Sequence, residues 1–266
     1  MIDLHNHSEF SFDSNTPIEE NIKAAIEKGL KYISVTDHMD LIKVTDDYRD
    51  HTDIEGYFEK INLLKDSSKK NIKTLSGIEV GIQKETAMQN DEITSNYNFD
   101  FIIGSVHSLK EEDIYFADLY NRYNSKDLFK LYYSEMYKAV KDTKNFDVLG
   151  HMDYIDRYAP NSSRVPNIED NKEMIFEILK YLISNGKGIE VNTAGIRQGL
   201  SYMHPTIEIL KWYKELNGEI ITIGSDAHIK EDIGAGVFDA CKMLEELGYS
   251  GIYVFEKRIP KKLYFK

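Results

Sequence analysis

The sequence has one cysteine, Cys241, and no stretch apolar enough to cross a membrane. A lone thiol cannot form an internal disulfide, which excludes a disulfide-stapled fold and favours a reducing compartment. A membrane span needs roughly 18 consecutive apolar residues, and the first residues lack the basic and apolar regions of a signal peptide. We therefore expect a cytoplasmic protein with no membrane partner.

An excess of positive charge is also missing. The net charge is −12 and the isoelectric point is near 5.2, whereas nucleic-acid binding needs a basic surface. We therefore expect no nucleic-acid partner. Hydrophobic residues make up 41% of the chain and charges are spread along it, which predicts a folded protein. Without a linker or composition shift, residues 1–266 are interpreted as one domain, and the oligomeric state is unknown.

Two common catalytic patterns are absent. The chain has no Gly-x-Ser-x-Gly elbow and no glycine-rich phosphate loop. Cys241 falls inside an expected helix, so a cysteine nucleophile is not indicated either. The chemistry must come from other side chains.

Short β-branched segments alternate with amphipathic helical patterns along the chain. Strands are expected at 2–4, 32–35, 72–80, 99–106, 146–149, 188–191, 220–223 and 251–255. Helices are expected from 16 to 29 and near 54–66, 125–142, 169–185, 206–216 and 234–247. Thr16 and Pro17 are typical of the N-cap and first position of a helix. This alternation predicts a parallel sheet, open or closed.

Side chains that bind metals stand at or just past the end of nearly every expected strand. They are His5, His7, Asp13, His38, Glu79, His107, His151, Asp226 and His228. Residues two apart on a strand point to the same side, so His5 and His7 can bind one cation together. Many ligand-bearing strand ends meet at one place only if the sheet closes. We therefore expect an α/β barrel with its metal site at the C-terminal strand ends, overhung by loops 38–53 and 107–124.

The residue types indicate which metals would bind. A lone histidine is more often structural than a ligand, but six of the eight histidines occupy these strand ends. Imidazole and carboxylate groups without thiolates suit Zn, Mn or Fe. Nine ligands exceed the needs of one catalytic ion, so we expect two to three divalent ions, with Glu79 able to bridge two. Such ions lower the pKa of bound water to about 7, which predicts a metal-dependent hydrolase.

Six segments, in this order, resemble the successive motifs of the polymerase-and-histidinol-phosphatase (PHP) family. They are Asp3–His7, Thr36–His38, Gly77–Val80, Gly104–His107, Gly150–Asp153 and Ser225–His228. The run 150–157, and 190–195 followed by Arg197, are most similar to the histidinol-phosphatase branch. The resemblance implies a distorted (β/α)7 TIM-like barrel with a trinuclear metal site.

The resemblance also implies how the ligands divide among three ions. The first ion would be held by His5, His7, Glu79 and Asp226. The second would be held by Glu79, His107 and His151, and the third by Asp13, His38 and His228. The family often has histidine where this chain has Asp13, which adds negative charge and a harder oxygen donor at the third position.

Several further residues are candidates for contacting substrate or supporting the site. Arg157 and Arg197 follow site-facing strand ends, and a planar guanidinium suits bidentate phosphate contacts. Tyr115 and Tyr120 are other candidates for substrate contact. Arg164 and His204 are weaker candidates for substrate contact. Asp37 and Asp153 either fix the tautomers of the neighbouring histidines or are ordinary hydrogen-bonding groups at strand ends. His51 is interpreted as a surface residue.

The resemblance implies hydrolysis of L-histidinol phosphate to L-histidinol and phosphate in histidine synthesis. A metal-bridging hydroxide near Glu79 would attack phosphorus while the ions and arginines neutralise the equatorial oxygens. Asp226 or His228 would protonate the leaving alkoxide. One alternative is another phosphate ester, such as a nucleotide, an oligonucleotide end or a phosphotyrosyl protein. A non-catalytic domain with a relic site is the other alternative, but it predicts missing ligands, and all nine positions carry metal-competent groups.

Overall fold

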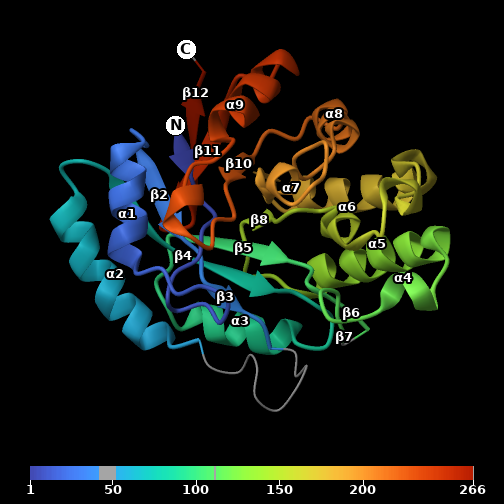
Figure 1. The fold of residues 1–266 in the computed structure, drawn as a ribbon, viewed down its shortest axis with the longest axis horizontal. Coiled ribbons are helices and arrows are strands. Elements are labelled where there is room, and N and C mark those ends of the chain that lie inside the picture. Colours follow the sequence, from blue (N-terminus) through green and yellow to red (C-terminus); the bar gives the residue numbers. More distant parts are fainter. Residues whose placement is uncertain (42–51, 111, 266) are drawn as a thin grey trace.

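The computed structural model describes residues 1–41, 52–110 and 112–265, and seven parallel strands form its centre (Figure 1). In sheet order they are β1 (Ile2–Asp3), β2 (Tyr32–Val35), β4 (Lys73–Gly81), β5 (Phe101–Ser105), β8 (Val148–Leu149), β9 (Gly188–Asn192) and β10 (Ile221–Gly224). The backbone N–H of Leu4 donates to the carbonyl of Ile223 at 2.9 Å, which brings the last strand beside the first. The expected seven-stranded α/β barrel is confirmed.

Helices connect the strands and lie around the outside of the barrel (Figure 1). They are α1 (Ile18–Glu27), α2 (Ile54–Ser68), α3 (Ala87–Ser95), α4 (Leu119–Arg122), α5 (Ser125–Asp142), α6 (Lys172–Ser184), α7 (Ala194–Arg197), α8 (Ile207–Glu215) and α9 (Val237–Glu246). Short 3-10 turns occupy Tyr154–Tyr158, Ser162–Arg164, Ile168–Asn171 and Lys230–Asp232. No helix in these described ranges has the length and apolar character that crossing a bilayer requires.

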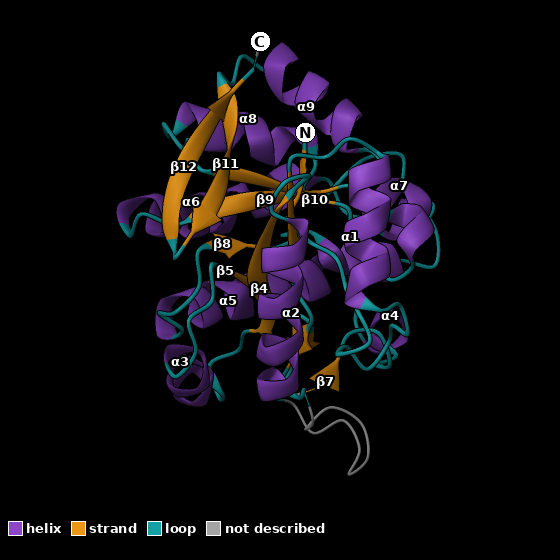
Figure 2. Ribbon diagram, turned by 90° about the vertical axis from the view of Figure 1, so that its left-hand side faces the viewer, coloured by secondary structure: helices purple, strands orange, loops and turns teal. Residues whose placement is uncertain are grey.

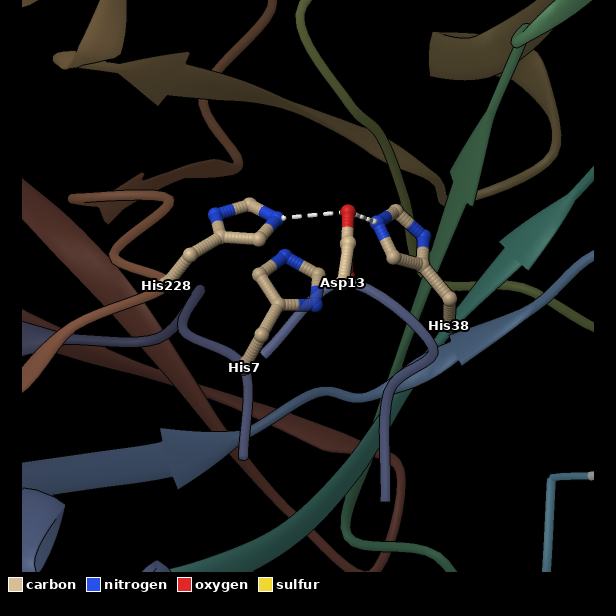
Figure 3. Close-up of side chains that lie close together, drawn as sticks. All are labelled: His7, Asp13, His38 and His228. Carbon is tan, nitrogen blue, oxygen red and sulfur yellow. Dashed lines mark hydrogen bonds and ion pairs between the residues drawn. The ribbon is translucent and has the colours of Figure 1, made fainter. Parts of the chain in front are cut away.

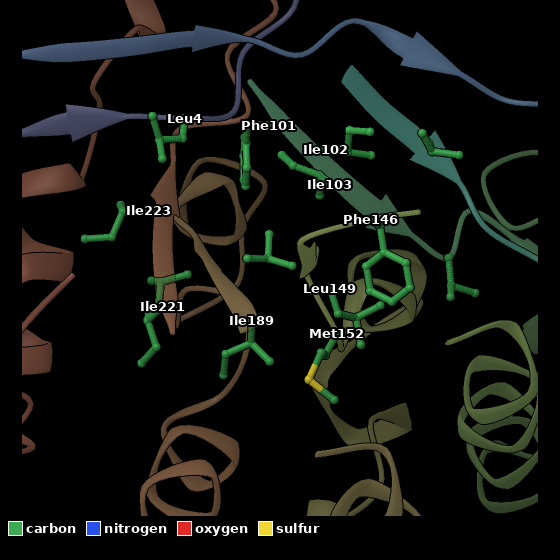
Figure 4. Packing of buried hydrophobic residues seen from close by; sticks show 14 of the residues in the cluster. Leu4, Phe101, Ile102, Ile103, Phe146, Leu149, Met152, Ile189, Ile221 and Ile223 are labelled. Atoms are coloured by element: carbon green, nitrogen blue, oxygen red, sulfur yellow. The ribbon is translucent and has the colours of Figure 1, made fainter. Parts of the chain in front are cut away.

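The strands are buried because both faces of a parallel barrel are covered, by side chains inside and by helices outside. Apolar residues from successive strands, such as Leu4, Ile103 and Ile189, pack together at the centre (Figure 4). Gly224 stands where the first and last strands meet. A Cβ there would lie 2.1 Å from the Cβ of His5, so this seam closes only around a glycine.

The eighth expected strand does not join the barrel. Residues 251–255 lie in β11 (Gly251–Glu256), which pairs antiparallel with β12 (Ile259–Tyr264), a strand that the pattern did not predict (Figure 2). Lys257 and Arg258 between them both have positive φ, 53° and 66°. Two such residues form the tight turn that suits a β-hairpin, and this turn carries none of the usual Asn-Gly signal. Helix α3 was also not predicted.

The start of α1 differs from the expected capping pattern. Pro17 is the N-cap, and the Thr16 hydroxyl donates instead to the carbonyl of His228 at 3.2 Å. Glu9 accepts from the backbone N–H of Ile18 at 2.8 Å and so takes over the capping role. Thr16 therefore connects α1 to the loop that carries His228.

Residues 42–51 lie outside the described residues. They include His51, which is expected at the surface, and most of the loop 38–53, which is expected to overhang the site.

Candidate metal centre

The nine predicted ligands converge at the C-terminal ends of the barrel strands. His5 and His7 follow β1, Asp13 lies in the next turn, His38 begins β3 (His38–Met39), Glu79 is near the end of β4, His107 and His151 follow β5 and β8, and Asp226 and His228 follow β10. β3 pairs with the last part of β4, which brings His38 directly opposite Glu79. The closed barrel therefore brings together residues more than two hundred positions apart in the chain.

Two imidazoles and two carboxylates form a first group. Nε2 of His5 lies 3.2 Å from Oε2 of Glu79 and 3.8 Å from Oδ1 of Asp226. Nε2 of His7 lies 3.7 and 3.3 Å from the same two oxygens. Ligands held tetrahedrally about 2.0–2.1 Å from one zinc ion are about 3.3–3.4 Å apart, and these four nitrogen–oxygen distances are close to that spacing. His5, His7 and Glu79 together could hold one cation, with Asp226 beside them.

The hydrogen bonding of this first group supports the same interpretation. Nε2 of His5, Nε2 of His7 and Oε2 of Glu79 are buried, and none makes a hydrogen bond of good geometry within the described residues, although Oε2 lies 3.0 Å from Nδ1 of His38. A buried polar atom without a partner costs about 1–3 kcal/mol. One cation shared among these atoms would satisfy all three together.

The other oxygen of Glu79 belongs to a second group. Its Oε1 lies 3.2 Å from Nε2 of His107 and 3.0 Å from Nε2 of His151, and the two nitrogens are 3.4 Å apart. These three atoms form a nearly equilateral triangle of the size expected around one cation. Because each oxygen of Glu79 faces a different group, this carboxylate can bridge two ions.

The third predicted group surrounds Asp13 (Figure 3). Its Oδ2 lies 3.0 Å from Nε2 of His228 and 3.5 Å from Nε2 of His38. The ring of His7 stacks against both of these histidines, with centroids 4.1 Å from His228 and 4.3 Å from His38. A ligand atom of His7 lies within 4.8 Å of those of the other three. His7 thus adjoins the first and third groups, which the sequence motifs did not indicate.

The close contacts set the protonation of the site. Burial would raise the pKa of Glu79, but nearby imidazoles, including those of His5 and His107, hold it well below its ordinary value. Burial also lowers the pKa of His7 to about 3, which leaves this ring neutral. Burial opposes charge on His107 too, yet Asp40 and Glu79 raise its pKa to about 9. Metal ligands must be deprotonated, so a cation binding here would displace a proton from His107.

Most of the inward-facing Nε2 atoms are aimed by a partner on the opposite ring nitrogen. Nδ1 of His5 lies 2.6 Å from Oε1 of Glu190, and Nδ1 of His107 lies 2.9 Å from Oδ1 of Asp40. Nδ1 of His7 contacts the Ser11 hydroxyl at 3.1 Å. Such partners fix the ring orientation and the tautomer of metal-binding histidines. The sequence did not identify Glu190 or Asp40, although a glutamate inside a buried strand was a usable signal.

Neither aspartate proposed to fix the histidine beside it does so. Asp37 accepts from the backbone N–H and the hydroxyl of Ser8 and from the hydroxyl of Ser11, so it supports His7 through Ser11 rather than holding His38. Asp153 contacts Nδ1 of His204 at 2.5 Å rather than His151. Nδ1 of His151 is buried and makes no hydrogen bond in the described part of the chain.

A cavity of about 260 Å³ opens above the ligands. Its walls include Asp13, His38, Glu79, His107, His151, Asp226 and His228, together with Phe12, Tyr115, Phe116, Tyr154, Arg157, Tyr158 and Gln198. Tyr115 and Phe116 are more than half exposed, which places aromatic surface at the mouth. Arg157 is almost completely buried and donates to Asp226 at 2.9 Å. Two predicted substrate-binding residues, Tyr115 and Arg157, therefore line the cavity.

The remaining substrate candidates are engaged elsewhere. The Tyr120 hydroxyl donates to the carbonyl of Ile155 at 3.0 Å, so we no longer expect a substrate contact there. Arg164 donates to the Ser125 hydroxyl and to the Tyr120 carbonyl, at 3.0 and 2.5 Å. Arg197 precedes the cavity-lining Gln198, but its guanidinium donates to the carbonyl of Ser225 at 2.5 Å. Its contact with substrate stays a prediction.

We expect Glu190→Gln to weaken metal binding and activity by roughly 10–100-fold, as is typical of outer partners of metal sites. Oε2 of Glu190 accepts from the backbone N–H of His151, so a glutamine would keep its oxygen there and turn its NH₂ toward His5. The proton of His5 would then move to Nε2, the atom that faces the first group. Metal content after dialysis checks this, with Glu208→Gln on the exposed face of α8 as the control. Unchanged metal retention would contradict it.

Comparison with known proteins agrees with this geometry. A model of the PHP domain matches residues 3–194. A Clostridium acetobutylicum protein named "Probable histidinol-phosphatase" is 34% identical over 98% of this chain and 99% of its own length. The histidinol-phosphatase of Lactococcus lactis subsp. lactis is 29% identical over 96% of this chain and 94% of its own.

A solved structure extends the comparison to three dimensions. The crystal structure of histidinol phosphate phosphatase from Lactococcus lactis, a complex with Zn, L-histidinol and phosphate, superposes with a TM-score of 0.88. It is 28% identical in sequence, and the match covers 98% of each chain. Two chains this similar over their whole length share the barrel and the order of its strands.

Proposed function

This chain belongs to the PHP domain family, and from that premise we propose that it hydrolyses L-histidinol phosphate to L-histidinol and phosphate. The observation that carries the proposal is one cavity lined by both the ligand groups and the buried Arg157. Metal ligands beside a cationic fork suit a phosphate ester. The relatives are named for this activity, and the Lactococcus protein was crystallised with both reaction products.

Two to three divalent ions, Zn, Mn or Fe, would be held by the three groups described above. When bound, such ions supply Lewis acidity, which makes water a nucleophile near neutral pH and neutralises phosphoryl charge. The chain itself provides the arrangement: Glu79 links two groups, and Glu190 and Asp40 aim the imidazoles. Buried surroundings strengthen these electrostatic interactions relative to water.

Leaving-group protonation requires a side chain that reaches the cavity. Asp226 is poorly suited, because Oδ2 already accepts from Arg157 and Oδ1 lies 3.3 Å from Nε2 of His7. His228 lines the cavity, and its side chain is about one third exposed. We therefore favour His228 over Asp226 as the proton donor. To protonate the leaving alkoxide, Nε2 of His228 must carry a proton, so it cannot hold the third cation at the same time.

The size of the cavity and the net charge of the protein favour a small substrate. A cavity of about 260 Å³ is close to the lower end of the roughly 300–1,000 Å³ of ligand pockets. Tyr115, which is more than half exposed and lines the cavity, offers an aromatic ring to a flat group such as imidazole. The net charge of −12 disfavours a nucleic acid as substrate. We accordingly propose a small-molecule phosphate ester as the partner, and the cytoplasm as the location.

The direct test measures turnover of four phosphate esters by one metal-replete preparation. They are L-histidinol phosphate, a mononucleotide, a 3′-phosphorylated oligonucleotide and a phosphotyrosyl peptide. We expect kcat/KM for L-histidinol phosphate to exceed each of the others by about 10²-fold or more, since 1.4 kcal/mol of differential transition-state binding is already tenfold. A preference for any other ester would contradict the proposed substrate while leaving the phosphatase chemistry in place.

Metal content provides an independent prediction. We expect more than one ion per chain in purified, unchelated protein, with two retained and a third lost first on mild chelation. The third group is the weakest because Asp13 and His228 are each about one third exposed, whereas the other two groups are buried. Elemental analysis along a chelator titration checks this order. A content of at most one ion per chain would contradict the three-group assignment.

A further inference from the structure

Behind the cavity, a row of buried polar groups ends on Arg157. Asp153 and His204 are completely buried, and Oδ1 of Asp153 lies 2.5 Å from Nδ1 of His204. The other ring nitrogen, Nε2, lies 2.9 Å from Nε of Arg157. The row therefore runs from carboxylate to imidazole to guanidinium, and none of the proposed metal chemistry accounts for it.

The tautomer of His204 follows from these contacts. Arg157 can only donate, so Nε2 of His204 must accept, and its proton must lie on Nδ1, facing Asp153. Asp153 is held in turn, because its Oδ2 accepts from the backbone N–H of Thr206 at 2.7 Å. Each member of the row thus has one hydrogen-bonding arrangement available.

The row determines which part of the guanidinium is left for a ligand. Arg157 has five N–H donors: Nε donates to His204, and Nη2 donates to Asn192 at 3.2 Å and to Asp226 at 2.9 Å. The side chain also lies against the ring of Tyr154, with the guanidinium carbon 5.0 Å from its centroid. Nη1 makes no hydrogen bond to any residue that the structure describes. Its two N–H groups are those left to bind a phosphate oxygen in the cavity.

We propose that Asp153 and His204 are positioning residues, which hold Arg157 so that Nη1 is presented to the phosphate group. This rests on the proposed phosphatase function. An arginine side chain has many rotamers, and immobilising it before the substrate arrives removes an entropic cost of binding. His204 and Asp153 act only through Arg157, and neither lines the cavity.

Two substitutions of His204 separate positioning from packing. In His204→Gln the amide oxygen can occupy the place of Nε2 and accept from Arg157. In His204→Asn the shorter amide reaches only the place of Nδ1, so the contact with Asp153 survives and the contact with Arg157 is lost. If His204 only stabilised the fold, His204→Asn would not be the more damaging of the two variants, because asparagine keeps the hydrogen bond to the buried carboxylate of Asp153.

Asp153→Asn tests the same row from its other end. The N–H of Thr206 requires an oxygen at the Oδ2 position, so the new NH₂ group faces Nδ1 of His204. His204 must then accept at Nδ1 and carry its proton on Nε2, directly against the N–H of Arg157. Asp156→Asn is the matched control, since Asp156 is equally buried in the same segment and contacts Tyr202 rather than His204.

The measurements are kcat/KM for L-histidinol phosphate, the inhibition constant of inorganic phosphate, metal content and melting temperature. For His204→Asn and Asp153→Asn we expect weaker phosphate inhibition and a lower kcat/KM, each by about 10–100-fold, the usual value of one charged hydrogen bond. Metal content should not change. His204→Gln should stay within about threefold of the unsubstituted protein, because its amide oxygen can still accept from Arg157. Asp156→Asn should do the same, because Asp156 contacts Tyr202 and not His204 or Arg157.

A double-mutant cycle gives the decisive result. If Asp153 acts through Arg157, then Asp153→Asn should have no further effect on phosphate inhibition in an Arg157→Ala background. Additive effects, or equal losses in His204→Gln and His204→Asn, would overturn the positioning role. If the unsubstituted, metal-replete protein neither hydrolyses phosphate esters nor is inhibited by phosphate, the proposed function itself fails and this inference fails with it.

Discussion

Glu79→Gln is expected to lower kcat/KM by at least about 10³-fold, more than any other single ligand change. Loss of even one transition-state hydrogen-bond donor costs roughly 10²–10³-fold in kcat. Glu79 serves two groups at once, with Oε2 3.2 Å from His5 and Oε1 3.0 Å from His151. A glutamine has one oxygen and one NH₂ group, and an amide nitrogen that carries two protons does not bind a cation. Whichever way the amide turns, one group loses its ligand and the other loses a negative charge.

Metal analysis on the same sample distinguishes this cause from a general loss of structure. Glu79→Gln should bind fewer ions per chain at an unchanged secondary-structure content. Asp13→Asn is the matched comparison, because Asp13 contacts only the third group, through His38 and His228. It should lose the weakest ion and retain more activity than Glu79→Gln. If the two variants lose the same number of ions and the same activity, Glu79 is not a bridge.

The sequence supports prediction of the barrel and of the ligands because both depend on local pattern. Strand β2 and helix α5 have the bounds expected from 32–35 and 125–142. Parallel strands of a closed barrel all end at the same face, so polar residues at their ends had to meet there. His5 and Glu79 could therefore be placed in one site, although 74 residues separate them.

The partners that aim those ligands could not be predicted in the same way. Glu190 is 185 residues from His5, Asp40 is 67 residues from His107, and Asp153 is 51 residues from His204. Which carboxylate meets which imidazole depends on loop geometry and on side-chain rotamers, and neither has a period in the sequence. Proximity in sequence was a poor guide to these pairs. Asp153 lies two residues from His151, yet it hydrogen-bonds to His204.

Arg157→Ala, measured at full metal loading, is expected to lower kcat/KM for L-histidinol phosphate by roughly 10²-fold or more. A charge-assisted hydrogen bond is worth about 1.5–3 kcal/mol, and Nη1 has two N–H groups to give. A guanidinium cannot bind a cation, but Arg157 donates to Asp226 at 2.9 Å. Phosphate inhibition measured at full metal loading therefore separates the lost phosphate contact from any effect on that ligand. Arg157→Lys should restore activity only in part, because an ammonium supplies charge but cannot satisfy His204, Asn192 and Asp226 together.

The same measurement made on Arg197 decides between two roles for the second arginine. Its Nη2 donates to the carbonyl of Ser225, next to Asp226, whose φ of 55° is uncommon for a residue with a side chain. If Arg197 contacts phosphate, as predicted, Arg197→Ala should weaken phosphate inhibition and keep its metal. If it only holds this backbone, Asp226 should shift and metal should be lost first.

For Arg157→Ala, normal turnover and normal phosphate inhibition would remove the main support for phosphate binding outside the metal ligands.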